Sequence, residues 1–354
     1  MADSNTVRIL QIDGGGARGY MSLCFLKDFV DLWGIDPTTI ASHFDVVCGT
    51  SAGGIIALMI AAGLTPDEML EFYTADVPYV FSLTSLSPSV RPIFEAKIAL
   101  VLASIPIYQS SGPTASDYGH GKLVSRLQSI FGGTTLQQLN SNVVIPVYEL
   151  DTSTYKIFSN LNYPEFSGQN LLVSDVALAT SAAPAYFPSW TIGDHAYIDG
   201  GTYNNNISQI GKFTAQSLKP NSNRSCVLSI GTGIGEMGFD TIPGNSILKK
   251  ALMKGLMENP SIFTPESTVA LLFALFDIAQ TGAQESIALG LALEAKYVNN
   301  QSSHYRFQDR LDLELNTELD NTDPDILVYY QSTEQSIWET DINNITTFLG
   351  KLTA

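Results

Sequence analysis

The stretch from Phe44 to Ala62, FDVVCGTSAGGIIALMIAA, decides the fold of this chain of 354 residues. It opens with a short apolar run that contains two adjacent valines, which predicts a buried strand. It ends with Ile55–Ala62, an unbroken apolar run before Gly63, which predicts a buried helix with a glycine cap. Between the two lies a sharp glycine-rich turn, GTSAG. A strand, a turn and a helix in this order are typical of an α/β protein.

The turn matches the pattern G-x-S-x-G, in which a strand-to-helix turn raises a serine hydroxyl above the end of a sheet. Small residues on each side avoid clashes at strained backbone angles, and the following helix directs its positive end at a developing oxyanion. Ser51 is therefore the candidate nucleophile, and the neighbouring Ala52 is expected to support the loop or the substrate. The alternative is that Ser51 only caps the N-terminus of a helix.

The rest of the chain continues the alternation of strands and helices. Arg8–Asp13 is an apolar run that stops at three glycines, and Met21–Trp33 follows it with helical spacing. Further strands are predicted at residues 142–150, 155–159 and 225–230, with helices between them and across 247–297. This order predicts a mostly parallel central sheet that helices flank on both faces. Residues 78–121 are either a loop-and-helix insertion over the site or an ordinary edge of the domain.

A second glycine-rich segment, DGGGARG at Asp13–Gly19, follows the first predicted strand. It also satisfies G-x-G-x-x-G, the pattern of dinucleotide-binding loops. Such a loop requires an acid at the end of a second strand about 20 residues later. Neither Asp31 nor Asp36 follows a β-type run, and the next strand delivers Ser51 instead. The better interpretation is an oxyanion hole made of backbone N–H groups. The groups concerned are those of Gly14, Gly15 and Gly16.

Arg18, in the same segment, would fix the loop or attract a substrate phosphate. A purely structural glycine turn is the simpler alternative for the whole segment.

The candidate base is Asp199, which ends a β-type run and precedes two glycines that leave its carboxylate without steric cover. It is able to accept the proton of Ser51. Taken alone, an aspartate in a turn is the simpler interpretation. A histidine base is less favoured: the order Ser, acid, His of α/β-hydrolases leaves only His304, and no glycine loop presents it. His195 follows Gly193-Asp194 in a predicted turn.

The bulk composition narrows the choice of partners. The formal net charge is −17, which argues against nucleic acid as a partner and discourages adhesion to anionic membranes. The three cysteines, Cys24, Cys48 and Cys226, are too far apart to suggest a metal site or a disulfide framework. No apolar run reaches the roughly 18 residues of a membrane span. We therefore expect a soluble protein without cofactor or metal. Because no secretory signal is visible, we expect it to be cytoplasmic or exported without a cleavable signal.

The three motifs, in this order, resemble the patatin-like phospholipases. The segment ATSAAPAYFP at Ala179–Pro188 is similar to the family's TSAAPxYFP, and LSIGTG at Leu228–Gly233 is similar to a family strand and loop. The strand pair at residues 142–146 and 157–159 and the late strand at 305–308 match as well, so the resemblance covers residues 8–325. One departure is Asn204–Asn206, where many members read Asn-Asn-Pro. The loop beyond the aspartate is therefore expected to differ in shape.

The resemblance implies a patatin-like variant of the α/β-hydrolase architecture. The expected organisation is a tail at 1–7, a catalytic domain at 8–325 with a lid at 78–121, and a C-terminal helical extension at 326–354 packed on the domain. It also implies a Ser51–Asp199 dyad, an oxyanion loop at the three glycines, and Arg18 in the family's basic position.

The implied activity is lipid acyl hydrolysis of the phospholipase A or lysophospholipase type, through an acyl-enzyme and without a metal. Substrates would be phospholipids or other acyl lipids met at membranes or micelles. A protein activator is a further possible partner, since some bacterial members of the family require one. The alternatives are a storage or interaction protein with weak esterase activity, which the turnover rate would reveal, and a nicotinamide-dependent oxidoreductase, which NAD(P)H titration would reveal.

Overall fold

The computed structural model describes residues 5–81, 120–184, 186–235, 281–298, 302–312, 319 and 321–354. Within these residues, nine strands form one sheet whose main path runs β10-β8-β1-β2-β3-β4-β5, with β7 paired to β3 and β6 paired to β7. The strands are β1 (Thr6–Ile12), β2 (Val46–Gly49), β3 (Val143–Glu149), β4 (Thr154–Ser159), β5 (Phe166–Ser167), β6 (Trp190–Ile192), β7 (His195–Asp199), β8 (Arg224–Ile230) and β10 (Ser303–Phe307). Two short strands, β9 (Ile234–Gly235) and β11 (Arg310–Leu311), form a separate parallel pair.

The sheet has a parallel half and a mixed half. Neighbouring strands are parallel from β10 through β8, β1 and β2 to β3. On the far side of β3 the chain turns back as a hairpin, so β4 is antiparallel to β3, and β7 also pairs with β3 in antiparallel fashion. The mostly parallel central sheet predicted from the sequence is confirmed.

Strand β1 shows why this sheet is covered on both faces. Val7 and Ile9 pack in one hydrophobic cluster, and Leu10 and Ile12 pack in the other. All four side chains are buried, and the alternation follows from the period of two along a strand. A strand buried on both faces is expected for a parallel sheet between two helical layers.

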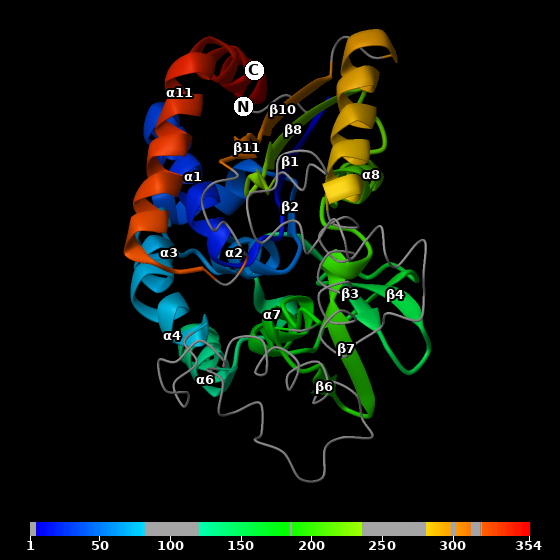
Figure 1. Cartoon of the computed structure of the whole chain (residues 1–354). Coiled ribbons are helices and arrows are strands. Elements are labelled where there is room, and N and C mark those ends of the chain that lie inside the picture. The colour runs from blue at the N-terminus through cyan, green and yellow to red at the C-terminus, as the bar shows by residue number, and fades with distance from the viewer. Residues whose placement is uncertain are drawn as a thin grey trace, which may run out of the picture.

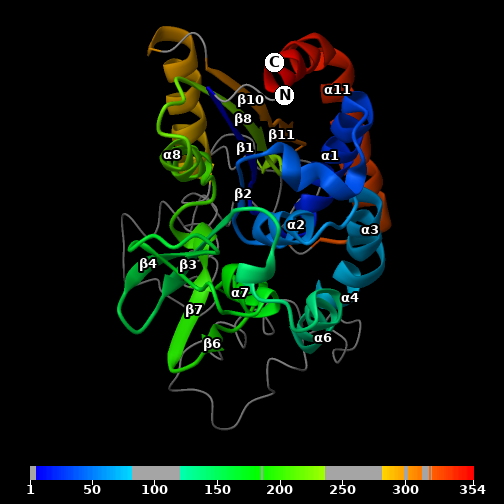
Figure 2. The ribbon, with the colours of Figure 1, turned by 180° about the vertical axis from the view of Figure 1, so that it is seen from behind.

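The helices lie on the two faces of the sheet, as Figures 1 and 2 show from opposite sides. One face carries α1, α2, α3, α7 and α11, and the other carries α8 and the helical residues 281–298. The helix bounds are α1 (Gly19–Trp33), α2 (Ala52–Ala61), α3 (Pro66–Glu71), α4 (Val77–Phe81), α6 (His120–Phe131), α7 (Val173–Thr180), α8 (Ser208–Leu218) and α11 (Pro324–Thr353). Short helical turns are η1 (Gly16–Arg18), η2 (Pro37–His43), η3 (Phe72–Asp76), η6 (Leu136–Gln138), η7 (Gly200–Thr202) and η9 (Glu294–Val298).

Several element boundaries differ from the expected ones. Strand β1 begins at Thr6, inside the expected tail, because Thr6 and Val7 already pair with β8. The C-terminal helix begins at Pro324, with the Asp323 side chain as its N-cap, and packs along α1. Most of the expected lid at 78–121 and of the predicted helices at 247–297 lies outside the described residues. The described part of the latter, 281–297, is helical.

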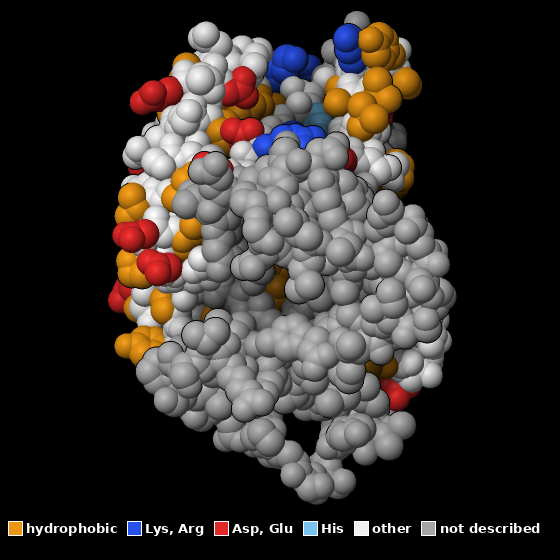
Figure 3. Space-filling view, viewed as in Figure 1, with side chains coloured by type: hydrophobic (Ala, Val, Ile, Leu, Met, Phe, Trp, Pro, Cys, Tyr) orange, Lys and Arg blue, Asp and Glu red, His pale blue; other side chains and the backbone are white. Residues whose placement is uncertain are grey.

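The outer face of helix 281–298 carries hydrophobic side chains, visible at the upper right of Figure 3. Leu289, Leu293, Tyr297 and Val298 are exposed there. No helix in the described part of the chain is both long enough and apolar enough to span a bilayer.

Candidate active site

The backbone at Ser51 has the geometry of a strained strand-to-helix turn. Ser51 has φ 56° and ψ −127°, although it is not glycine, and it is the residue before α2. Glycine is required nearby because the turn lies against β1: a Cβ on Gly53 would lie 2.3 Å from the carbonyl oxygen of Ile12. All ten residues of α2 are buried, which anchors the strained turn from one side.

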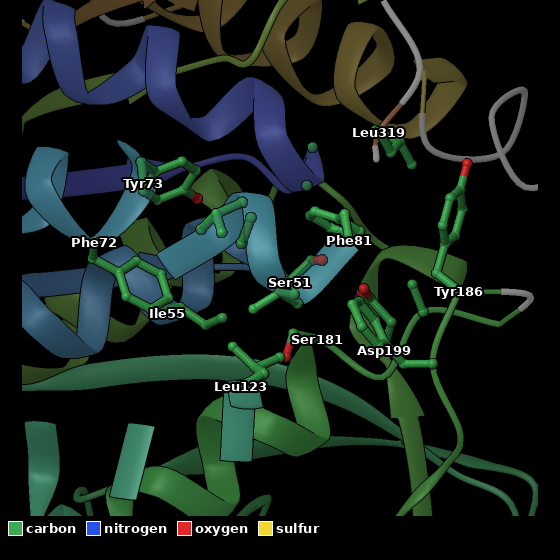
Figure 4. A pocket seen from close by; sticks show the side chains of 17 residues that line it. Ser51, Ile55, Phe72, Tyr73, Phe81, Leu123, Ser181, Tyr186, Asp199 and Leu319 are labelled. Atoms are coloured by element: carbon green, nitrogen blue, oxygen red, sulfur yellow. The ribbon is translucent and has the colours of Figure 1, made fainter. Parts of the chain in front are cut away.

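Asp199 ends β7 and faces Ser51 across a pocket, as Figure 4 shows. Its side chain is fully buried, and Oδ1 accepts a hydrogen bond of 2.6 Å from the N–H of Gly201. Oδ2 has no well-formed hydrogen bond to any residue in the described part of the chain. Burial raises the pKa of Asp199 to about 7, while the Ser51 hydroxyl and the Gly201 N–H oppose that rise. A carboxylate with a free oxygen and a pKa near neutrality is suited to act as a general base.

Strand β3 brings these two residues together. β4 occupies one edge of β3 from Val144 to Glu149, so β2 and β7 must share the other edge. β2 pairs with β3 only as far as Val144, and β7 arrives from the opposite direction with Asp199 beside Val147. The end of β2 and the end of β7 therefore meet along one edge, where Ser51 and Asp199 face each other.

The oxyanion loop differs from expectation at Gly14. Its N–H donates a 3.1 Å hydrogen bond to the side-chain oxygen of Asn205 and is therefore not free to bind an oxyanion. The N–H groups of Gly15 and Gly16 donate to no acceptor in the described part of the chain, and both residues line the pocket. Gly16 has φ +55°, and a Cβ there would lie 2.2 Å from the Leu319 carbonyl oxygen. Only Gly15 and Gly16 remain candidates for the hole.

The two supporting residues have different positions. Ala52 lines the pocket beside Ser51. Arg18 donates its backbone N–H to the Gly15 carbonyl, which closes the loop. Burial raises the pKa of Tyr330, on α11, to about 12, and the positive charge of Arg18 opposes this rise. Arg18 is not among the residues that line the pocket, so the geometry gives no support to the phosphate-binding interpretation.

The pocket itself is mostly apolar and has an empty volume of about 590 Å³, its open mouth included. Ser51 and Asp199 lie among its lining residues, and side chains from α2, η3, α4 and α6 form much of the wall (Figure 4). The apolar walls are Ile55, Phe72, Val77, Val80, Phe81, Leu123 and Phe187. A site with walls of this polarity suits an aliphatic group better than a charged metabolite.

The histidines with described side chains lie elsewhere. His304 is in β10 beside Val227, His195 begins β7, and neither lines the pocket, nor does His43. His195 instead belongs to the one group of possible metal ligands in the described part of the chain, with Glu149 and Asp151. The Lys156 ammonium already lies 3.4 Å from Glu149, and the group is at the opposite end of β7 from Asp199.

Two side chains at the site were not singled out in the sequence. Thr180 accepts a hydrogen bond from the Ser51 N–H, and Asn205 holds Gly14. Thr180 lies in the segment similar to the family's TSAAPxYFP, and Asn205 lies in the Asn204–Asn206 departure. Those were the available signals, but both contacts join residues more than 100 positions apart.

Comparisons with known proteins identify the family of the chain. The family model described as patatin-like phospholipase matches residues 10–209. A cGAMP-activated phospholipase of Vibrio cholerae is 34% identical over 216 residues, covering 58% of this chain and 57% of the relative. Patatin-like protein 2 of Arabidopsis thaliana is 30% identical over 260 residues, which cover 65% of this chain and 60% of the relative. The chain thus spans less than two thirds of the length of these curated relatives.

Among solved structures, the match with VipD from Legionella pneumophila covers 97% of this chain and 67% of VipD, with a TM-score of 0.45 and 12% identity. The match with human GIVD cytosolic phospholipase A2 covers 99% of this chain and 60% of the human chain, with a TM-score of 0.40 and 11% identity. Overall similarity at this level carries no argument about the site. The family model matches more than half of the chain and includes the Ser51 turn, the glycine loop and Asp199. The chain belongs to the patatin-like phospholipase family.

Proposed function

We propose that this protein is a lipid acyl hydrolase of the phospholipase A or lysophospholipase type, with Ser51 as nucleophile and Asp199 as base. The observation that carries the proposal is the buried carboxylate of Asp199, which has one oxygen free and faces Ser51 in an apolar pocket. Burying a carboxylate that accepts so few hydrogen bonds costs free energy, so a role in proton transfer would explain why it is there.

The reaction follows from these positions. Asp199 takes the proton of Ser51 while the serine oxygen attacks the acyl carbonyl carbon. The N–H groups of Gly15 and Gly16 stabilise the negative oxygen of the tetrahedral intermediate. The intermediate collapses, the proton passes from Asp199 to the leaving alcohol, and an acyl-enzyme remains. Asp199 then takes a proton from a water molecule whose oxygen attacks the acyl carbon, which gives a second tetrahedral intermediate. As this intermediate collapses, the bond to Ser51 breaks, the proton passes from Asp199 to the Ser51 oxygen, and the fatty acid leaves.

The substrate class follows from the walls of the pocket. The apolar side chains of η3, α4 and α6 would receive the acyl chain and remove it from water, which is favourable by about 0.8 kcal/mol for each buried methylene. The described residues that line the pocket include no cationic side chain. Selectivity is therefore expected to depend on the acyl chain more than on a charged headgroup.

The first test is labelling with a fluorophosphonate probe, with mass spectrometry to locate the adduct. Wild type should be labelled at Ser51, and Ser51→Ala and Asp199→Asn should not be labelled. Wild type should also hydrolyse phosphatidylcholine or lysophosphatidylcholine in mixed micelles, and the two variants should not. Since one relative is described as cGAMP-activated, each assay is run with and without cGAMP. A folded wild type that is neither labelled nor active under any of these conditions would overturn the proposal.

A further inference from the structure

The two adjacent residues Asn204 and Asn205 contact each part of the proposed catalytic site. Their backbone is tied to the loop after Asp199, because the Asn204 N–H donates to the Gly200 carbonyl at 2.9 Å. The Asn204 carbonyl accepts a 3.1 Å hydrogen bond from the Thr50 hydroxyl, in the turn that carries the nucleophile. The next residue, Asn205, reaches the glycine loop. One short segment thus joins the base, the nucleophile turn and the oxyanion loop.

The side-chain amide of Asn205 pairs with the peptide groups of Gly14. Its oxygen accepts the Gly14 N–H at 3.1 Å, and its nitrogen donates to the Gly14 carbonyl at 3.0 Å. The Thr232 hydroxyl donates to the same carbonyl at 2.9 Å. Asn205 and Thr232 are fully buried, so water does not compete for these bonds.

Gly14 packs closely against both Asn205 and Ser51. A Cβ added to it would lie 2.4 Å from the Asn205 side-chain oxygen and 2.8 Å from the Ser51 Cβ. No side chain larger than hydrogen fits at position 14. Gly15 and Gly16 follow this position directly in the chain. A shift of Gly14 would change where the next two N–H groups point. Oxyanion holes depend on donors held in place before the reaction.

We infer that Asn205 is a positioning residue: its side-chain amide holds Gly14 so that the N–H groups of Gly15 and Gly16 face the carbonyl attacked by Ser51. The inference rests on the proposed function for its effect on turnover, but not for its effect on the loop. Asn205 touches neither substrate nor reacting atoms, and the Gly14 N–H serves to anchor the loop.

The neighbouring Asn206 provides a matched control. It is also fully buried and also has two side-chain hydrogen bonds, from the Ser208 N–H at 3.0 Å and to the Ser229 hydroxyl at 3.1 Å. Neither bond reaches Gly14, Gly15 or Gly16, although the Asn206 side chain also interacts with the Asp13 carboxyl, which it helps to keep ionised. Asn205→Ala and Asn206→Ala therefore remove the same chemical groups from adjacent positions, and a purely structural role predicts the same effect for both.

The experiment measures kcat, KM, the rate of fluorophosphonate labelling and the thermal midpoint of both variants. Asn205→Ala should lower kcat and the labelling rate by about 100-fold, the cost of one misplaced oxyanion donor, with KM changed less than about threefold. Asn206→Ala should lower the thermal midpoint by a similar amount and kcat by less than about fivefold. Asn205→Asp keeps the size of the side chain and the acceptor for the Gly14 N–H but loses the amide donor, and should also lose turnover. Retention of kcat by Asn205→Ala, or equal losses in both alanine variants, would contradict the inference.

Hydrogen exchange of the peptide spanning residues 10–20 separates this inference from the proposed function. Exchange should accelerate clearly more in Asn205→Ala than in Asn206→Ala, whether or not the wild type hydrolyses lipid. An inactive wild type with this exchange pattern would contradict the proposed function but would still support the positioning role of Asn205. Unchanged exchange in Asn205→Ala would sink the positioning role even in an active enzyme.

Discussion

The Thr180 hydroxyl holds the backbone of Ser51 in place through a hydrogen bond. Its oxygen accepts the Ser51 N–H at 3.1 Å, and its proton is donated to the Pro146 carbonyl at 2.7 Å. Thr180 is the last residue of α7 and is fully buried. One hydroxyl therefore connects Ser51, the central strand β3 and the helix that precedes Asp199 in the chain. The strained backbone of Ser51 needs such a fixed partner.

Replacing Thr180 by valine should weaken both stability and turnover. Valine has nearly the same shape but cannot accept the Ser51 N–H, which is left buried without a partner. We expect a loss of about 1–3 kcal/mol in the free energy of unfolding and about a tenfold loss in kcat. Denaturant unfolding and steady-state kinetics measure the two effects. Thr180→Ser keeps the hydroxyl and should retain most of both; a valine variant as stable and active as Thr180→Ser would refute the role of the hydrogen bond.

Asp199→Asn should abolish turnover and leave the fold intact. The amide has the same shape but cannot accept the proton of Ser51, and general-base catalysis contributes about 10²–10⁴-fold. His304→Ala should change turnover little, because His304 lies in β10 and does not line the pocket. Circular dichroism confirms folding, and hydrolysis of a lysophospholipid measures turnover. A folded but inactive His304→Ala would show that the dyad assignment is wrong.

The pH dependence of kcat/KM should show an acid limb near pH 7. The pKa of Asp199 is raised to about 7 mainly by burial, and only the ionised carboxylate accepts a proton. Below that pH, activity should fall about tenfold for each unit. A pH series on a soluble monomeric ester measures this limb without interference from micelle charge. A limb centred near pH 4 would mean that the carboxylate is not buried in the working enzyme.

The same shift predicts how Asp199→Asn changes stability. Because the folded-state pKa is above the unfolded value, the wild type loses stability as pH rises from about 4 through about 7. The asparagine variant has no such loss. It should therefore unfold with a free energy higher by a few kcal/mol at pH 8, at most about 4, and with no advantage near pH 4. Equal stabilities at pH 8 would argue against a desolvated carboxylate.

Glu334 predicts a second pH effect, remote from the site. It lies on α11, is 1% exposed, and its Oε1 has no partner in the described part of the chain. Burial, and to a lesser extent Asp28, raises its pKa to about 8. Stability is therefore lost as pH rises from about 4.5 through about 8, and Glu334→Gln should regain about 2 kcal/mol at pH 9 but nothing near pH 4. Denaturant unfolding at the two pH values measures the gain.

The control for Glu334 is Glu339→Gln, an exposed position on the same helix. It should change stability by less than about 0.5 kcal/mol at either pH. If both glutamine variants gained equally, the effect would come from net charge and not from the buried carboxylate.

The strands and helices around the site were predictable because each is written in a local pattern. The apolar run before GTSAG and the one after it are β2 and α2. The run before the triglycine is β1, which differs only in starting at Thr6. Ser51, Gly15, Gly16 and Asp199 were predictable as candidates because small residues must surround a sharp turn. Gly14 was misjudged, since nothing local shows that its N–H is already bonded to Asn205.

By itself, the sequence determined the order of strands and helices, the strained turn at Ser51 and the family, since these depend on residues that are neighbours in the chain. Only the tertiary structure decided which groups are free to react. Oδ2 of Asp199 is unpaired, while the Gly14 N–H is paired, and both facts depend on contacts between distant segments. Burial raises the pKa of Asp199, and burial is a property of the packed core. Local patterns specify which residues stand at a site, and packing decides their protonation and their available hydrogen bonds.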